Sequence, residues 1–137
     1  MLKLKRIYNQ PDPDDGRRYL VDRIWPRGVR KTDASLDEWL KVLAPSAELC
    51  KWFNHDPARW EEFQARYQRE LDAPERREIL DRLAREIEAG DVTLLYGAKD
   101  EQRNQAVVIR QALEERRKEQ SHRERPDSLT FDGWFDA

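Results

Sequence analysis

One short stretch of the sequence gathers polar side chains that could bind a ligand or transfer a proton. Residues 22–31 read Asp-Arg-Ile-Trp-Pro-Arg-Gly-Val-Arg-Lys, so one carboxylate lies among several cations. Guanidinium groups form forked hydrogen bonds with carboxylates or phosphates. We assign Arg23 and Arg27 to ligand binding, and Asp22 to orienting Arg23 or to acting as a catalytic base. A structural ion pair between Asp22 and Arg23 is the alternative interpretation.

A second group of polar residues follows the nearly continuous apolar run at residues 91–96, which is typical of a buried strand. We expect Tyr96 and Asn104 to contact a ligand and Lys99 to stabilise negative charge during catalysis. Asp100 either caps the following helix or leaves the N–H groups of that helix free to bind an anion. The chain contains no GxGxxG and no Walker motif, so the sequence does not predict a nucleotide site.

Three single residues complete the set of candidates. His55 is a further catalytic candidate because its ordinary pKa lies near neutrality, although a His in such a loop often packs on a ring or bonds the backbone. Trp25, beside Pro26, is expected to form a wall of the pocket. Cys50 is the single cysteine and is interpreted as a packing residue. With two His and no spaced partners, no metal ligand and no cofactor are expected.

The elements that would position these residues alternate between strands and helices. Strands separated by helices pair in parallel by default, and ligands of such sheets bind beyond the carboxyl ends of the strands. We therefore predict an α/β fold, a small three-layer helix-rich domain around a mainly parallel short sheet. The expected strands are 2–8, 18–25 and 91–96, and the expected helices are 35–43, 47–53, one opened by Asp56 and Pro57 that reaches Leu71, 74–90 and 101–118.

The remaining part of the chain, residues 119–137, is acidic and aromatic and has no helical periodicity. We treat residues 1–118 as the α/β domain and residues 119–137 as an appendage that is partly ordered or docks on a surface. Docking on a second copy would make a homo-oligomer, with the apolar side chains supplying buried area. Those side chains are Leu129, Phe131, Trp134 and Phe135.

Composition limits the partners and the compartment. The net charge is −2, whereas a general nucleic-acid binder usually has a basic excess. Residues 1–31 do carry nine Lys/Arg against four Asp/Glu, a local balance of +5, so an adaptor that binds protein or nucleic acid is the alternative function. The N-terminus has no apolar signal region, no run approaches the ~20 residues of a membrane span, and the lone Cys fits a reducing compartment. We expect a cytoplasmic protein without membrane contact.

Several short segments match a known family jointly and in order. On them the chain resembles the YeaO-like branch of a bacterial family of domains of unknown function, over roughly residues 1–118. The resemblance implies a three-layer α/β fold but no activity and no residue roles. Gly97 departs from the pattern, where a small residue such as Ala is expected. The matching segments are Val21–Gly28, Asp37–Trp39, Leu43–Ser46, Lys51–Phe53, His55–Asp56, Trp60–Phe63, Thr93–Tyr96, Ala98–Asp100 and Asn104–Ala106.

The function that these observations favour is a pocket for a small anionic ligand at the carboxyl ends of two strands. The sequence leaves open whether the pocket only binds or also catalyses a reaction.

Overall fold

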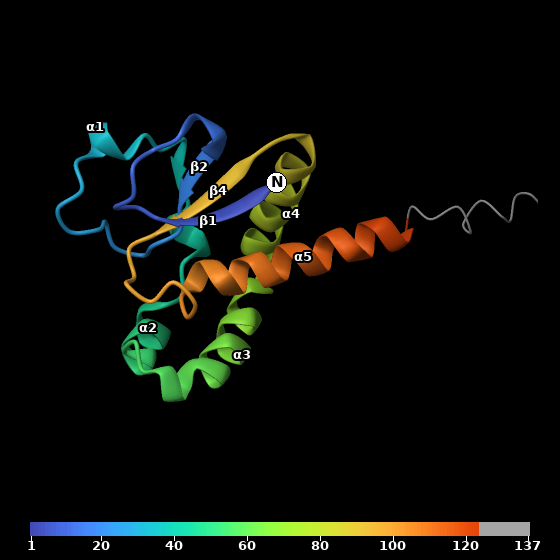
Figure 1. The fold of residues 1–137 in the computed structure, drawn as a ribbon. Helices are drawn as coiled ribbons and strands as arrows, with labels where there is room; N and C mark the ends of the chain where they lie inside the picture. Colours follow the sequence, from blue (N-terminus) through green and yellow to red (C-terminus); the bar gives the residue numbers. More distant parts are fainter. Residues whose placement is uncertain (124–137) are drawn as a thin grey trace, which may run out of the picture.

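A computed structural model of the chain describes residues 1–123 (Figure 1), with side chains described through residue 119. Its centre is a four-stranded sheet of order β1-β4-β2-β3 in which every pairing is parallel. Because the strands are parallel, their carboxyl ends lie at one edge of the sheet. The strands are β1 (Leu2–Arg6), β2 (Arg17–Leu20), β3 (Glu38–Trp39) and β4 (Val92–Tyr96).

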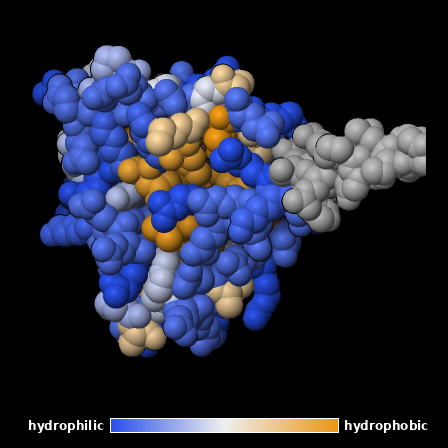
Figure 2. All heavy atoms as spheres, turned by 45° about the vertical axis from the view of Figure 1, so that its right-hand side comes forward, coloured by the Kyte–Doolittle hydropathy of each residue, from blue (hydrophilic) through white to orange (hydrophobic). Residues whose placement is uncertain are grey.

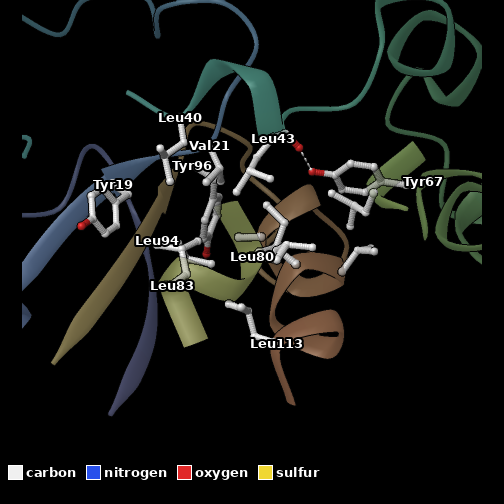
Figure 3. Packing of buried hydrophobic residues seen from close by; sticks show 14 of the residues in the cluster. Tyr19, Val21, Leu40, Leu43, Tyr67, Leu80, Leu83, Leu94, Tyr96 and Leu113 are labelled. Carbon is white, nitrogen blue, oxygen red and sulfur yellow. Dashed lines mark hydrogen bonds between the residues drawn. The ribbon is translucent and has the colours of Figure 1, made fainter. Parts of the chain in front are cut away.

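Longer helices cover one face of the sheet. Side chains from α4 and α5 pack against alternate residues of β2 and β4, and Figure 3 shows Leu83 and Leu113 beside Leu94 and Tyr96. In Figure 1, α2 and α3 lie farther from the sheet, and α5 runs out from the rest of the molecule. The helices are α2 (Ala47–Phe53), α3 (Trp60–Leu71), α4 (Pro74–Ala89) and α5 (Gln105–Arg123).

The opposite face has a thinner cover, made by the short helix α1 (Lys31–Ala34) and the loops around it. Leu20 of β2 and Leu95 of β4 pack there against Ala34, and the rings of Trp25 and Trp39 lie against this group. Both faces of β2 and β4 are therefore buried, as is usual in a parallel sheet. The predicted α/β fold with a mainly parallel short sheet is confirmed, and the helices are distributed unequally over its faces.

Charged residues make up 39% of the chain, and hydrophilic residues cover most of the surface seen in Figure 2. On the face in that view, apolar side chains come to the surface as one central group. No helix among the described residues combines the length and the apolarity that crossing a bilayer requires.

The predicted helix at residues 35–43 is wrong. Ser35 has a left-handed backbone, with φ of 51°, and ends α1 instead of capping a new helix. Asp37 then bonds β2 twice: its N–H donates to the Arg18 carbonyl, and its carboxylate accepts from the Arg18 N–H, each at 2.8 Å. These bonds draw the chain alongside β2, so Glu38–Trp39 forms an edge strand and only Lys41–Leu43 is helical, as a 3-10 turn.

Two predicted strands are too long, and the last predicted helix lies four to five residues too close to the N-terminus. The first strand ends at Arg6, and the second ends at Leu20, with one further ladder bond from the Val21 N–H to the Leu95 carbonyl. Beyond it the chain turns, so Trp25 is not part of the strand. The helix expected at 101–118 begins at Gln105 and continues to Arg123. The appendage predicted at 119–137 therefore begins inside α5, and the residues through which we expected it to dock lie outside the described part of the chain.

Candidate functional site

The segments that follow β2 and β4 meet at the carboxyl edge of the sheet. Asp22, two residues after β2, lies beside Gly97, which directly follows β4, and the Gly97 N–H donates to Asp22 Oδ2 over 3.0 Å. The second oxygen, Oδ1, accepts a hydrogen bond from the side-chain amide of Gln105 in the first turn of α5. One carboxylate thus joins the ends of two strands to the start of a helix.

Gly97 is required by this close approach. A Cβ atom at this position would lie 2.7 Å from Asp22 Oδ2, closer than side chains pack. The loop is also held from the other side by Arg6, which donates to the Gly97 carbonyl over 3.2 Å and to the Ala98 carbonyl over 2.9 Å. A methyl group at position 97 would therefore displace the Asp22 carboxylate from its present position, while its other neighbours lie at ordinary contact distances.

A Gly97→Ala substitution tests that condition. We expect it to push the Asp22 carboxylate away, break the bond to the backbone N–H, and cost about 1–3 kcal/mol, the range typical of overpacking. Chemical denaturation against the unaltered protein measures the cost. Gly90→Ala is the control, because a Cβ atom there meets nothing within 4 Å. Equal losses in the two variants would contradict the role given to Gly97.

Asp22 lies on the lining of a cavity of about 600 Å³ that opens to solvent. Its walls are largely apolar. The rings of Phe53 and Phe63 stack with centroids 4.3 Å apart, and they come from α2 and α3. Ile24, at the rim, is 74% exposed. The other apolar side chains of the lining are Pro26, Pro45, Ala47 and Ala98.

The charged side chains of the lining are mostly cationic. Arg23, Lys51 and Arg103 face the cavity, and Asp22 is the one carboxylate among its lining residues. Arg103 is paired with Asp100 over 3.4 Å. Arg23 has no carboxylate within ion-pair distance among residues 1–119, so the predicted alternative of a structural Asp22–Arg23 pair is not seen there. The cavity therefore has an excess of positive charge.

Burial raises the pKa of Asp22 to about 6, and the hydrogen bonds from Gly97 and Gln105 offset only part of that rise. The cause is desolvation, which disfavours the charged form of a carboxyl group in a mostly apolar setting. A group with such a pKa exchanges protons near neutral pH. Asp22 can therefore act as a hydrogen-bond acceptor when ionised, or as a donor when protonated.

Four of the residues predicted from the sequence line this cavity: Asp22, Arg23, His55 and Asn104. His55 is exposed, has a left-handed backbone with φ of 54°, and places its ring 6.2 Å from that of Phe53. Asn104 is 2% exposed, and its side chain caps α5 by accepting from the N–H groups of Ala106 and Val107. Its amide also donates to the Asp100 carbonyl over 2.9 Å, so few of its hydrogen bonds remain for a ligand.

The other four predicted residues do not line the cavity. Tyr96 is 2% exposed and lies in the core, where burial raises its pKa. Trp25 packs edge-on against Trp39 on the opposite face of the sheet, and its Nε1 donates to the Val29 carbonyl over 2.7 Å. Arg27 and Lys99 are both exposed. The expectation that Trp25 walls the pocket assumed a strand that continues to residue 25.

Sequence reasoning missed several residues that shape the site. Phe53 and Phe63 lie on helical stripes and gave no sign that their rings border a cavity. Gln105 is not among the candidates that the sequence suggests. Cys50, interpreted as packing, is exposed and lines the cavity. Among the residues that the structure describes, no group of three or more His, Cys, Asp or Glu side chains could hold a metal ion.

Comparisons with known proteins place the chain in a family. An uncharacterized protein of Mycobacterium tuberculosis, Rv3073c, is 42% identical over 113 residues, which are 82% of this chain and 92% of the relative. The uncharacterized protein YeaO of Escherichia coli is 42% identical over 108 residues, 79% of this chain and 92% of the relative. No solved structure matches the chain significantly. The family model described as the inactive DUF488-N3 subclade matches residues 1–131, and the chain therefore belongs to this family.

Proposed function

We propose that the cavity beside Asp22 binds a small organic anion without converting it. The observation that carries this proposal is the guanidinium group of Arg23, which lines the cavity and has no carboxylate partner among residues 1–119. An Arg side chain presents planar, forked donors that suit a carboxylate or a phosphate. Lys51 adds a second cation to the lining, so a bound anion would be attracted from more than one side.

The place and the size of the cavity support the same function. In open parallel sheets, ligands bind beyond the carboxyl ends of the strands, where the loops diverge. A volume of about 600 Å³ suits a ligand of metabolite size, because small-molecule sites measure roughly 300–1,000 Å³. The apolar walls would bury the body of the ligand, and the cations would fix its charged end.

Binding is favoured over catalysis for two reasons. The subclade to which the chain belongs is described as inactive, which favours binding without catalysis. In addition, the three residues considered for catalysis do not form a unit, because Lys99 is exposed and off the lining, and no hydrogen bond joins Asp22 to His55 among those of the described residues. A nucleophile or base that works in catalysis is normally held by a partner at hydrogen-bond distance.

An Arg23→Ala substitution tests the function. Small carboxylates and phosphates, added singly, should raise the melting temperature of the unaltered protein, since a ligand that binds only the folded state stabilises it. We expect Arg23→Ala to weaken binding of each hit at least tenfold by calorimetry, the loss of about 1.4 kcal/mol or more that a charged hydrogen bond implies. Arg27→Ala, exposed and off the cavity, should change nothing. Equal effects of the two variants would overturn the proposal.

A second function is favoured by one separate observation. Arg27, Arg30 and Lys31 are all exposed and follow one another around α1, and none has a carboxylate within ion-pair distance among residues 1–119. Such a surface could dock an acidic protein or a nucleic acid. Nucleic-acid binding would weaken steeply with salt, because neutralised phosphates release counterions. Fluorescence anisotropy with labelled DNA and RNA at low and high salt tests whether the surface binds nucleic acid. No binding at low salt would rule out this function.

A further inference from the structure

We propose that the anion bound in the cavity also carries an amino group, which donates to Asp22, and that the two charged ends are joined to a flat apolar body. Aromatic amino acids are the simplest compounds of this class. The inference rests on the proposed function, because it takes anion binding by Arg23 as given and adds the chemistry of the rest of the ligand.

Asp22 has hydrogen-bonding capacity that the protein does not use. A carboxylate offers about four lone-pair positions, and the described contacts occupy one on each oxygen, through Gly97 and Gln105. No Lys, Arg or His nitrogen lies within ion-pair distance of Asp22 among residues 1–119. Even a half-buried carboxylate without a cation carries a desolvation cost, so a cationic donor that entered the cavity would compensate this charge.

The same argument disfavours a simple inorganic anion. Asp22 and Arg23 are adjacent in the chain and both line the cavity, so a phosphate that bonds Arg23 would lie near the charge of Asp22. Like charges repel strongly where water is partly excluded. A zwitterion avoids this conflict because its anionic end can bond Arg23 while its ammonium end bonds Asp22. The lining therefore requires one acceptor and one donor from the same ligand.

The walls of the cavity select the body of the ligand. Phe53 and Phe63 belong to these walls but are only 7% and 2% exposed, so the accessible aromatic ring of the lining is that of Tyr8, which is 48% exposed. Ile24, which is 74% exposed, and the partly exposed Ala98 add apolar surface to the lining. Aromatic groups pack on such surfaces in offset-stacked or edge-on arrangements and bury a large area. A ring joined to a short chain that carries both charges fits this arrangement better than an extended polar ligand.

A matched pair of probes tests the inference. L-phenylalanine and 3-phenylpropionate share the ring and the carboxylate, and only the first has the amino group. We expect calorimetry at pH 7.5 to show about tenfold tighter binding of phenylalanine, the effect of one charge-assisted hydrogen bond. Asp22→Asn should abolish that preference, because it weakens the binding of phenylalanine and, by removing a like charge near Arg23, tightens the binding of 3-phenylpropionate. Arg23→Ala should weaken both probes, and Arg27→Ala should alter neither.

The outcomes separate this inference from the function on which it rests. If 3-phenylpropionate binds as tightly as phenylalanine, or if inorganic phosphate binds more tightly than both, the inference is wrong and anion binding stands. The same holds if other anions bind through Arg23 and neither probe does. If no anion binds in a way that depends on Arg23, the proposed function itself fails. A purely structural Asp22 would change the melting temperature on substitution and leave the preference for the amine unchanged.

Discussion

Replacing Asp22 with Asn is expected to stabilise the protein at neutral pH. Burial raises the pKa of Asp22 from 3.8 to about 6, so ionising this group in the folded state costs roughly 3 kcal/mol, at about 1.4 kcal/mol per pKa unit. Asn is neutral and close in shape. Its oxygen can accept from the Gly97 N–H, and its amide can donate to Gln105 once the Gln105 amide turns over.

The same substitution should remove a pH dependence. The folded state holds the Asp22 proton more tightly than the unfolded state, so the contribution of Asp22 to stability is fully present below about pH 3.8 and is lost as pH rises to about 6. Urea denaturation of the two proteins between pH 4 and pH 7.5 measures the difference. We expect the curves to converge at the acid end and to separate as pH rises, with Asp22→Asn the more stable.

Asp100→Asn is the matched control, because Asp100 is another carboxylate in the same part of the fold with the opposite behaviour. Hydrogen bonds, first from the Gln102 N–H, lower its pKa, so its contribution to stability is present above its unfolded pKa and lost as pH falls. Its substitution should therefore destabilise at neutral pH. A loss of stability in Asp22→Asn at pH 7.5 would contradict this expectation. It would show that the ionised carboxylate stabilises the fold by holding the two loops together.

Replacing Arg18 with Met is expected to cost the most stability, about 3–5 kcal/mol, because it takes one of two cations from a buried carboxylate and leaves two backbone carbonyls without their donor. Arg18 is 4% exposed and is paired with the buried carboxylate of Asp15. Its guanidinium also donates to the carbonyls of Ser35, over 3.1 Å, and Ala34, over 2.9 Å, and so it holds the end of α1 against the sheet. In the variant, Asp15 would keep one cationic partner, Lys5, whose ammonium nitrogen lies 3.0 Å from its carboxylate.

Arg17→Met provides the comparison for Arg18, since it makes the same chemical change one residue earlier. The Arg17 side chain is exposed, and its contact with Glu86 is 3.4 Å long, so we expect a much smaller change. Denaturation in urea at pH 7 measures both variants. Similar losses at the two positions would contradict this prediction. They would mean that Asp15 is solvated well enough without Arg18, and that the buried pair contributes no more to the free energy of unfolding than an exposed one.

These two expected results have opposite signs for a physical reason. Asp15 is buried with two cationic partners, whereas Asp22 is half-buried with none among residues 1–119. The first arrangement stabilises the fold, and the second one weakens it. Natural proteins keep a destabilising group mainly where it serves a function. The contrast therefore marks Asp22 as the residue around which a ligand site is best sought.

The elements with strong local signals could be predicted from the sequence. Pro74 and Gly90 bracket α4, Asp56 and Pro57 open the turn that leads into α3, and the apolar run at 91–96 is β4. In each, the local preference and the tertiary packing agree. The error at residues 35–43 has the opposite cause. Ser35 followed three residues later by Glu38 has the spacing of a capping box, which favours a helix, but pairing with β2 competes with it, and the bonds of Asp37 to Arg18 stabilise the strand.

The sequence by itself determined the class of fold and the parallel pairing, since periodicity and strand order are local or topological properties. It also singled out Asp22 and Arg23 as candidate site residues, although it placed them inside a strand that ends at Leu20. Only the tertiary structure decided what surrounds them. Trp25 and Tyr96 turned to other surroundings because β2 ends early and the face of β4 that bears Tyr96 is covered by helices. Phe53, Phe63 and Gln105 reached the site from α2, α3 and α5, because helix packing brings together side chains that are distant in sequence.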